Sequence, residues 1–456
     1  MACTYRFTVL GCRVNHAERR DMETVLRSRG LRKSESSADI EVVHTCSVTG
    51  TAAAKSRNAI RRASRRGGRV IVTGCFPGTD GGVAAELGDA VVPQAGEGVM
   101  IDRFAETLDA MLDQPRATGV VVRRAVTLPV TMPKQPAHHV RAELRIQDGC
   151  DAHCTFCIIP KIRTTLRSKK IGDVVAEATR LVDLGHQEIV LTGIFIGAYG
   201  HETALRRKQV DPDREHLADL LDAVAQIKGL GRLRLSSMEP GDVTNVLLDA
   251  MLANQPIIAP HLHLPLQSGS DAVLHKMNRQ YDTDMYLDMI AMVQDRLTLD
   301  ALPPAITTDI ICGFPSEDEN DFDRTIEIAQ RVGFLHMHVF PYSVRSGTAA
   351  ARWPQLPASV IRHRVQTLLS LDSELSLSYR RNLVDHEVRV LIEHPANGTE
   401  YARGRCDHYA EITLATNALP GTLVAARVTH ATATTTPAVT VLPVLQQQAV
   451  TLTSQR

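Results

Sequence analysis

Six of the nine cysteines fall into two sets of three, and thiols so grouped are typical ligands of a metal centre. One set, Cys150, Cys154 and Cys157, has the spacing C-x-x-x-C-x-x-C. A closed structural site uses four protein ligands, whereas three leave one metal position open for chemistry. The alternative is a zinc site with His153 as the fourth ligand. Because His153 directly precedes Cys154, the two side chains rarely reach one tetrahedral metal together.

The other set is Cys12, Cys46 and Cys75, and each of them follows a predicted strand. Parallel strands bring their carboxyl ends to one edge of a sheet, so we expect the three thiols to meet in space. The alternative is three buried structural thiols. The odd number of cysteines and the length of the chain argue against a disulfide framework, and we assign no role to Cys3, Cys312 and Cys406.

Residues 1–130 alternate β-rich runs with helical patterns, which predicts a domain with a parallel sheet. Strands are expected at 6–11, 40–45 and 69–73, and helices at 16–29 and 55–66. A segment with prolines and little periodicity, 131–140, is predicted to be a linker.

From 141 to 381 the alternation restarts and predicts an open six-stranded βα partial barrel, with a doubly wound sheet as the second possibility. In either fold, ligands gather at the carboxyl ends of the strands. The expected strands are 142–147, 188–192, 232–236, 261–266, 305–311 and 335–341. Helices are expected at 173–184, 216–227, 243–252, 283–295, 319–332 and 361–381.

Residues 382–445 are predicted to form a small all-β barrel, with strands at 387–393, 409–413 and 422–428. The chain becomes rich in Thr and Ala from Ala431, and we expect no regular structure from there through a tail at 446–456. The fold class is therefore α/β with a small all-β module at the end.

The composition narrows the possible functions. Lys+Arg and Asp+Glu both number 51 in 456 residues, which excludes a polybasic protein held to nucleic acid by bulk charge, but not a local basic patch. No apolar run approaches 18 residues, so we expect no membrane association. The first residues show no secretory signal, and the expected location is cytoplasmic.

The Cys150 motif, with Phe156 before its last cysteine, resembles the signature of radical S-adenosylmethionine (SAM) enzymes. In that family the three thiolates hold a 4Fe–4S cluster whose open iron binds SAM. One electron then cleaves SAM to a 5′-deoxyadenosyl radical. The usual core of the family is a six-stranded partial barrel, the architecture expected above.

The resemblance narrows to the methylthiotransferases, whose motifs occur in order along nearly the whole chain, and the C-terminal module resembles their RNA-binding TRAM domain. The matching segments are LGCRVNHAE (10–18), HTCSVT (44–49), VTGC (72–75), CTFCIIPKIRTTLRS (154–168), LTGIFIGAYG (191–200), RLSSMEP (234–240), HLHLPLQSGSDAVLHKMNR (261–279), TTDIICGFPSE (307–317) and FPYSVRSGTAA (340–350). The chain departs from the family at His44, where Asn is usual, and at Thr164-Thr165.

This resemblance implies a second 4Fe–4S cluster, held by Cys12, Cys46 and Cys75, whose open iron carries the sulfur to be donated. One SAM methylates that sulfur, and a second SAM supplies the radical that activates an adenine C–H bond. The electrons would come from a donor such as flavodoxin or ferredoxin. Residues expected near SAM are Phe156, Gly193, Ser237, Glu239 and Gln267, although Phe156 could simply fill its loop.

Three subfamilies compete for the substrate. Two modify an adenosine beside the tRNA anticodon, bearing a threonylcarbamoyl or an isopentenyl group, and the third modifies an aspartate of a ribosomal protein. The variants G-C-[KR]-V-N at 11–15, T-C-[ST]-V-T at 45–49 and the run at 55–62 resemble the threonylcarbamoyl type. This predicts methylthio insertion at carbon 2 of threonylcarbamoyl-adenosine at tRNA position 37. An Arg or Ser near the mouth of the barrel could pair with its carboxylate. The alternative of another class is a non-catalytic iron–sulfur protein that binds RNA or carries electrons.

A basic run without acidic residues extends from 51 to 70 and could contact tRNA phosphates, the alternative being a solvated helix face. The partner would be the anticodon loop, where an unpaired base enters a pocket at low cost. The residues predicted to contact RNA are Lys55, Arg57, Arg61, Arg62, Arg65, Arg66, Arg163 and Arg167. Four histidines, His261, His263, His336 and His338, are expected to line the barrel as neutral, hydrogen-bonded side chains rather than as metal ligands.

Overall fold

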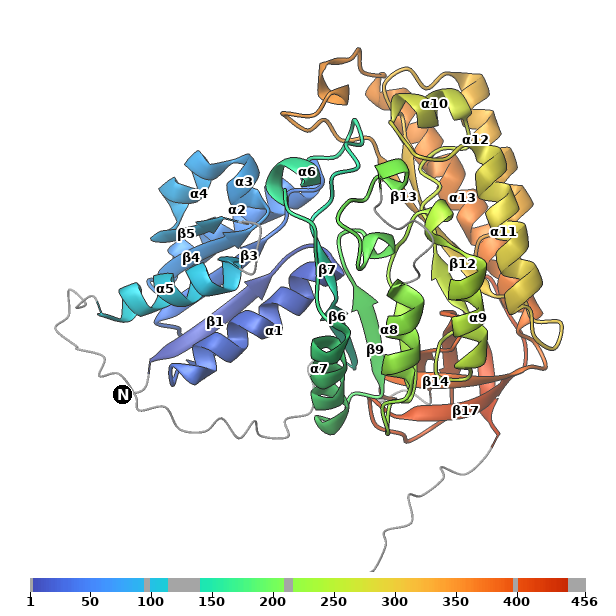
Figure 1. Ribbon diagram of the computed structural model, residues 1–456, viewed down its shortest axis with the longest axis horizontal. Helices are drawn as coiled ribbons and strands as arrows, with labels where there is room; N and C mark the ends of the chain where they lie inside the picture. The colour runs from blue at the N-terminus through green and yellow to red at the C-terminus, as the bar shows by residue number, and fades with distance from the viewer. Residues whose placement is uncertain (1–2, 94–98, 114–139, 209–215, 397–400, 442–456) are drawn as a thin grey trace, which may run out of the picture.

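The computed structural model describes residues 3–93, 99–113, 140–208, 216–396 and 401–441. It has three parts, an N-terminal sheet with helices on both faces, a partial barrel and a small β-barrel (Figure 1). The predicted linker at 131–140 lies almost wholly outside the described residues, and the tail at 446–456 lies entirely outside them. Among the described residues, no helix has the length and apolar content needed to cross a membrane.

The N-terminal sheet is parallel throughout and has the order β2-β1-β3-β4-β5. Its strands are β1 (Thr4–Val9), β2 (Arg32–Lys33), β3 (Ile40–Thr45), β4 (Arg69–Gly74) and β5 (Ala90–Pro93). Its helices are α1 (Arg13–Ser28), α2 (Gly50–Ser64), α3 (Phe76–Thr79), α4 (Gly81–Leu87) and α5 (Val99–Asp113). The register sets Val9 beside His44 and Thr45 beside Gly74, so the strands that precede the first three cysteines end at one edge.

The partial barrel has six parallel strands in chain order, as the sequence predicts. They are β6 (Arg141–Arg145), β9 (Glu188–Thr192), β10 (Arg232–Leu235), β11 (His261–His263), β12 (Ala305–Cys312) and β13 (His336–Pro341). A bridge between Leu233 and Ile258 joins the two halves. The outer helices are α7 (Ile171–Asp183), α8 (His216–Ala225), α9 (Asn245–Ala253), α11 (Thr283–Leu297), α12 (Glu319–Val332) and α13 (Ala358–Asn382). Their apolar faces and the strands form the largest core, which includes Leu191, Leu233 and Ile306.

The C-terminal part is a closed barrel with the order β14-β15-β16-β18-β17, which fits the predicted TRAM-like module. Its strands are β14 (Glu387–His394), β15 (Ala402–Arg405), β16 (Glu411–Leu414), β17 (Leu423–Val428) and β18 (Pro437–Thr440). The expectation of no regular structure beyond Ala431 is wrong at β18. This strand pairs with both β16 and β17 and buries Ala438, because the barrel closes only through it.

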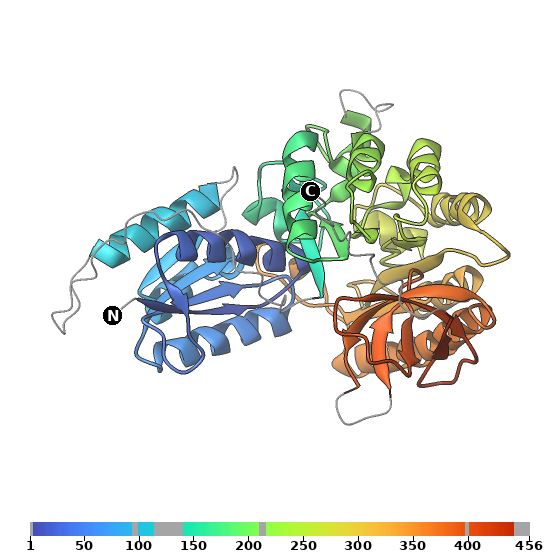
Figure 2. The ribbon, with the colours of Figure 1, turned by 90° about the horizontal axis from the view of Figure 1, so that it is seen from below.

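The small barrel closes the amino end of the partial barrel, so the opposite, carboxyl end is left for ligands (Figure 2). Arg232, at the start of β10, donates to the carbonyls of Arg389 and Arg405, at 2.8 and 3.0 Å. Arg234 donates to the carbonyl of Asp407 at 2.8 Å. Both arginines are buried and also pair with Glu188.

Candidate functional site

Cys12, Cys46 and Cys75 come together at the carboxyl edge of the N-terminal sheet. Gly11, in the left-handed region at φ +112°, brings the Cys12 loop close to Cys46. A Cβ atom added to Gly11 would lie only 2.6 Å from the Cβ of Cys46. Gly74, at φ +95°, approaches Thr45 in the same way. A Cβ atom added to Gly74 would lie 2.4 Å from the carbonyl oxygen of Thr45. Burial raises the pKa of the Cys75 thiol to about 12. The edge is therefore built so closely that only glycine fits at these turns.

The second set lies in a loop closed by a two-stranded ribbon, β7 (Gln147–Asp148) with β8 (Arg167–Ser168). Gln147 donates to the carbonyls of Asp148 and Gly149 at 2.9 and 2.8 Å and accepts from the Phe195 N–H at 2.8 Å. The three thiols, Cys150, Cys154 and Cys157, are half-buried, whereas His153 is exposed at φ +54°. Burial raises the pKa values of Cys150 and Cys157 to about 12.

Arg279 is the residue beside this loop that sequence reasoning missed. Its guanidinium donates to Cys154 Sγ at 3.1 Å and pairs with Glu239 at 2.7 Å. Glu239 also pairs with Arg206 at 3.2 Å. Arg279 is the last residue of the segment 261–279 quoted above, so the signal was present in the sequence. A cationic donor on a thiol stabilises its thiolate form, the form that binds metal.

The two thiol sets border one apolar cluster. Ile158, Ile159 and Ile162, on and before the short helix α6 (Ile159–Ile162), form it together with Cys75. Cys150 and Cys157 lie against the same cluster. The two sets are therefore neighbours across one apolar wall, and a bound molecule at this wall would face both.

A buried charge network joins the N-terminal sheet to the partial barrel. Glu18 on α1 accepts from Arg163 at 2.9 and 3.0 Å, from Arg145 at 3.1 Å and lies 3.0 Å from His44 Nε2. Arg163 also pairs with Asp148 at 2.6 Å. Burial raises the pKa of Glu18, but Arg163, His44 and Arg145 outweigh it and hold the pKa well below its ordinary value.

The prediction that Arg163 contacts RNA is corrected by this network. Arg163 exposes only 2% of its surface, because both terminal nitrogens of its guanidinium pair with carboxylates inside the protein, those of Glu18 and Asp148. His44, the residue that departs from the family pattern, has the same partner, Glu18. Arg163 therefore joins the partial barrel to the N-terminal sheet through Glu18, while His44 holds Glu18 from within the N-terminal part.

We expect Glu18→Gln to lower the free energy of unfolding by about 3–5 kcal/mol, because it leaves the buried Arg163 without its main counter-charge. Urea unfolding followed by circular dichroism measures the effect. The matched control is Glu23→Gln on the same helix, whose partners Arg19 and Arg27 lie nearer solvent. We expect that control to cost less than about 1 kcal/mol. Equal losses in the two variants would contradict the role given to the network.

The residues predicted to lie near SAM are distributed around the carboxyl end of the barrel. Gln267 is at φ +63°, and its Oε1 is buried without a hydrogen-bond partner among the described residues. Gly193 leaves room for Gln147, because a Cβ atom added to Gly193 would lie only 3.0 Å from the Cβ of Gln147. Phe156 lies edge-to-face against Phe314, with ring centroids 6.4 Å apart. Ser237 follows β10 by two residues.

The four histidines line the inner face of β11 and β13 and are hydrogen-bonded, as predicted. Asp309 Oδ1 lies 3.2 Å from His263 Nε2 and 3.0 Å from His338 Nδ1, while His336 pairs with Asp372 at 3.0 Å. Ligand atoms of His263, Asp309 and His338 all lie within 4.8 Å, a spacing that a metal ion could also use. The fourth, His261, lies 3.0 Å from Thr307 Oγ1, and burial holds its pKa well below the ordinary value, so it is neutral.

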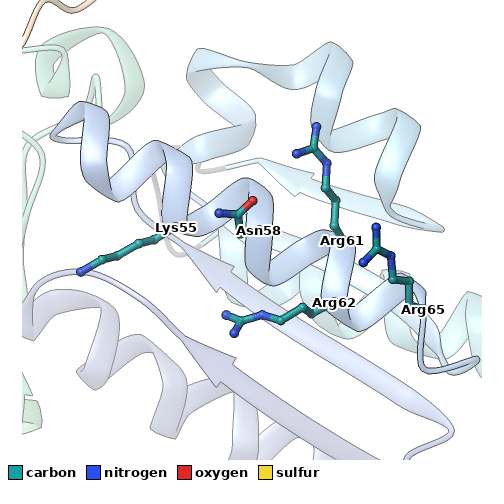
Figure 3. A pocket seen from close by; sticks show the side chains of 5 residues that line it. All are labelled: Lys55, Asn58, Arg61, Arg62 and Arg65. Carbon is teal, nitrogen blue, oxygen red and sulfur yellow. The ribbon is translucent and has the colours of Figure 1, made fainter.

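The predicted basic run forms an open depression of about 470 Å³ on the outer side of α2 (Figure 3). It is lined by Lys55, Asn58, Arg61, Arg62 and Arg65. Arg57 and Arg66 differ, because they pair with Asp80 at 3.6 Å and Glu41 at 3.1 Å. The lysine and the three lining arginines pair with no carboxylate among the described residues. We call these four residues the α2 patch.

Comparison with known proteins gives matches along most of the chain. A family model described as the radical SAM superfamily matches residues 144–329, and one described as uncharacterized protein family UPF0004 matches residues 4–92. The threonylcarbamoyladenosine tRNA methylthiotransferase of Bacillus subtilis is 34% identical over 423 residues, 90% of each chain. The tRNA-2-methylthio-N(6)-dimethylallyladenosine synthase 1 of Mycobacterium marinum is 33% identical, over 94% of this chain and 84% of that protein.

Solved structures of the same fold include one radical SAM enzyme that matches over most of its length. It is the radical SAM methyltransferase TsrM of Kitasatospora setae, with cobalamin and a [4Fe-4S] cluster bound. The match has a TM-score of 0.54 at 13% identity and covers 77% of each chain. The likeness extends over more than the partial barrel alone.

Proposed function

The chain belongs to the radical SAM methylthiotransferases that modify tRNA, and we propose that its substrate is threonylcarbamoyl-adenosine at position 37, methylthiolated at carbon 2. The observation that carries this proposal is the pair of three-thiol sets bordering one apolar wall. A substrate at the wall would lie beside both. The subfamily variants at 11–15, 45–49 and 55–62 favour the threonylcarbamoyl substrate, while the relatives include enzymes named for either adenosine.

Iron–sulfur clusters and SAM are the cofactors of this enzyme, and they supply the one-electron radical chemistry and the sulfur that no side chain offers. We propose that Cys150, Cys154 and Cys157 hold the cluster that binds SAM. The second cluster belongs at Cys12, Cys46 and Cys75. Both donor sets fit, since each is made of thiols only and leaves one metal position open. The buried Gln267 Oε1, an acceptor without a partner among the described residues, fits a donor on SAM.

The protein's own groups then do the positioning. Gln147 fixes the backbone of the second cysteine loop, and Arg279 ties its middle thiol to Glu239. Ile158, Ile159 and Ile162 pack against Cys75 on one side and against Cys150 and Cys157 on the other, and so keep water from these thiols. A flipped-out base from the anticodon loop would be the group that reaches this apolar wall, and a flavodoxin or ferredoxin would bring the electrons.

Mass spectrometry of tRNA nucleosides tests the substrate. Cells without the gene should lose the 2-methylthio derivative of threonylcarbamoyl-adenosine and accumulate the nucleoside without the methylthio group. Loss of the methylthio-isopentenyl nucleoside instead would assign the chain to the sister substrate. Normal tRNA together with an unmodified ribosomal aspartate would reject a tRNA substrate.

The α2 patch predicts a salt-dependent contribution to tRNA binding. Replacing Arg61, Arg62 and Arg65 by Gln should weaken tRNA binding and flatten its salt dependence. For each phosphate that the protein no longer neutralises, the log–log slope should fall by about 0.7 to 0.9 units. SAM cleavage without tRNA should persist, because the lining of this depression includes no residue of either thiol set.

A matched control removes three exposed arginines on the far side of the molecule, Arg324, Arg331 and Arg362, on α12 and α13 (Figure 1). These changes should leave the slope unchanged. If both triple variants shift the slope equally, the effect comes from net charge alone. If neither shifts it, the α2 patch is only a solvated helix face.

A further inference from the structure

Four arginines converge on Tyr409 where the small barrel closes the partial barrel. Arg13 Nη2 donates to the Tyr409 hydroxyl at 3.0 Å, although the two residues are 396 positions apart. Arg405, Arg234 and Arg141 lie 4.7, 5.3 and 5.8 Å from the ring centroid. The Tyr409 ring also stacks on His261, with centroids 4.4 Å apart. We call Arg13, Arg405 and Tyr409 the barrel floor.

The barrel floor carries positive charge that the protein does not balance. Arg234 pairs with Glu188 at 3.0 Å and Arg141 pairs with Glu393 at 2.7 Å. Arg13 and Arg405, in contrast, pair with no carboxylate within the described ranges. Both are half-buried, so water balances their charge less well than at an exposed surface. Burial raises the pKa of Tyr409, but Arg13, Arg141 and Arg405 outweigh it and lower the pKa, as expected of an excess of positive charge.

The barrel floor is adjacent to the first thiol set. Arg13 directly follows Cys12 and begins α1, so one arginine side chain connects the cysteine loop with the small barrel. A guanidinium has five donors, and the Tyr409 hydroxyl accepts from one Arg13 nitrogen, so donors remain for a ligand. An anion bound there would lie within the reach of one side chain from Cys12.

We propose that Arg13 and Arg405 bind the carboxylate of the threonylcarbamoyl group and so select this substrate. This inference rests on the proposed function and names the residues that read the substituent. Arginine recognises carboxylates through paired hydrogen bonds. An isopentenyl group has no acceptor for these donors, and a site built for hydrogen bonds rejects a partner that leaves them unpaired. Arg13 also occupies the position of the G-C-[KR]-V-N pattern at which either basic residue, Lys or Arg, stands.

Binding of three anticodon stem-loops to the anaerobic holoenzyme tests the proposal. The loops carry adenosine, threonylcarbamoyl-adenosine or isopentenyl-adenosine at position 37. Arg13→Gln should weaken binding of the threonylcarbamoyl loop by about 10- to 100-fold, the value of a hydrogen-bonded charge, and leave the adenosine loop unchanged. Arg405→Gln should likewise lower the ratio of threonylcarbamoyl-loop binding to adenosine-loop binding. Because Arg405 lies outside the cysteine loop, this variant still tests the proposal if Arg13→Gln fails to fold or loses iron. Arg403→Gln, on the same strand but exposed, is the matched control and should not change the ratio.

The other sources of an anion give different results. If Arg13→Gln and Arg405→Gln weaken all three loops equally, the barrel floor contacts a tRNA phosphate and the proposal is wrong. If either instead raises the KM for SAM in SAM cleavage without RNA, it contacts the SAM carboxylate, which also overturns the proposal. A wild-type enzyme that methylthiolates only the isopentenyl loop would refute the proposed function itself. Only this inference would be refuted if the wild-type enzyme modified the threonylcarbamoyl loop and both Arg13→Gln and Arg405→Gln left the ratio of threonylcarbamoyl-loop to adenosine-loop binding unchanged.

Discussion

Replacement of Cys150 by alanine is expected to abolish cleavage of SAM and to reduce the iron content from about eight to about four per chain. The reason lies in the second cysteine loop. Its three thiols are the complete donor set between β7 and β8, since exposed His153 is turned out of the loop by its backbone. No other thiol is available there to replace Cys150. Iron analysis after anaerobic reconstitution and chromatography of 5′-deoxyadenosine measure the two effects.

Cys312→Ala provides the control for Cys150→Ala. Cys312 is a buried free cysteine at the end of β12, in the same partial barrel but outside both sets. It should retain about eight irons and normal SAM cleavage. If Cys150→Ala kept its full iron content and still released 5′-deoxyadenosine, the assignment of this loop to the SAM-binding cluster would be wrong.

Much of the fold could be predicted because its strands and helices are periodic and alternate regularly. Buried parallel strands such as β3 and β9 are short apolar runs between helices, and the barrel order follows directly from that alternation. The placement of the first three cysteines followed from one rule, that parallel strands end at a common edge. Most of the missed elements are short, among them β2, β15 and α10 (Asp271–Lys276), since so few residues show no period. The helix α5 was missed as well, although it has 15 residues.

The errors concern contacts between residues far apart in the chain. Arg163 belongs to a basic stretch after the cysteines, so its sequence context indicates RNA binding. Its partner Glu18 is 145 positions away, and no local pattern shows that pairing. The strand β18 was missed for a similar reason, because a Thr-rich segment gains its structure only by closing a barrel. The contact between Arg13 and Tyr409 also depends entirely on how the three parts assemble.

Replacement of Cys46 by alanine is expected to have the opposite profile to Cys150→Ala, with loss of all methylthio transfer but persistent SAM cleavage. Cys46 follows β3, and Gly11 brings the Cys12 loop directly against it, so its loss breaks the first donor set. The second loop is held by Gln147 and Arg279, neither of which has a hydrogen bond or ion pair to β3 among the described residues. About four irons should therefore remain, and 5′-deoxyadenosine should form without methylthio product.

The comparison of these two variants separates the roles of the two thiol sets. Cys3→Ala is the control for Cys46→Ala, because Cys3 is buried just before β1, at the opposite edge of the same sheet. It should keep about eight irons and full transfer activity. If Cys46→Ala lost SAM cleavage as completely as Cys150→Ala, the two sets would not be independent. If it kept eight irons and still transferred the methylthio group, a second cluster at Cys12, Cys46 and Cys75 would be excluded, and the sulfur would have to reach the base from elsewhere.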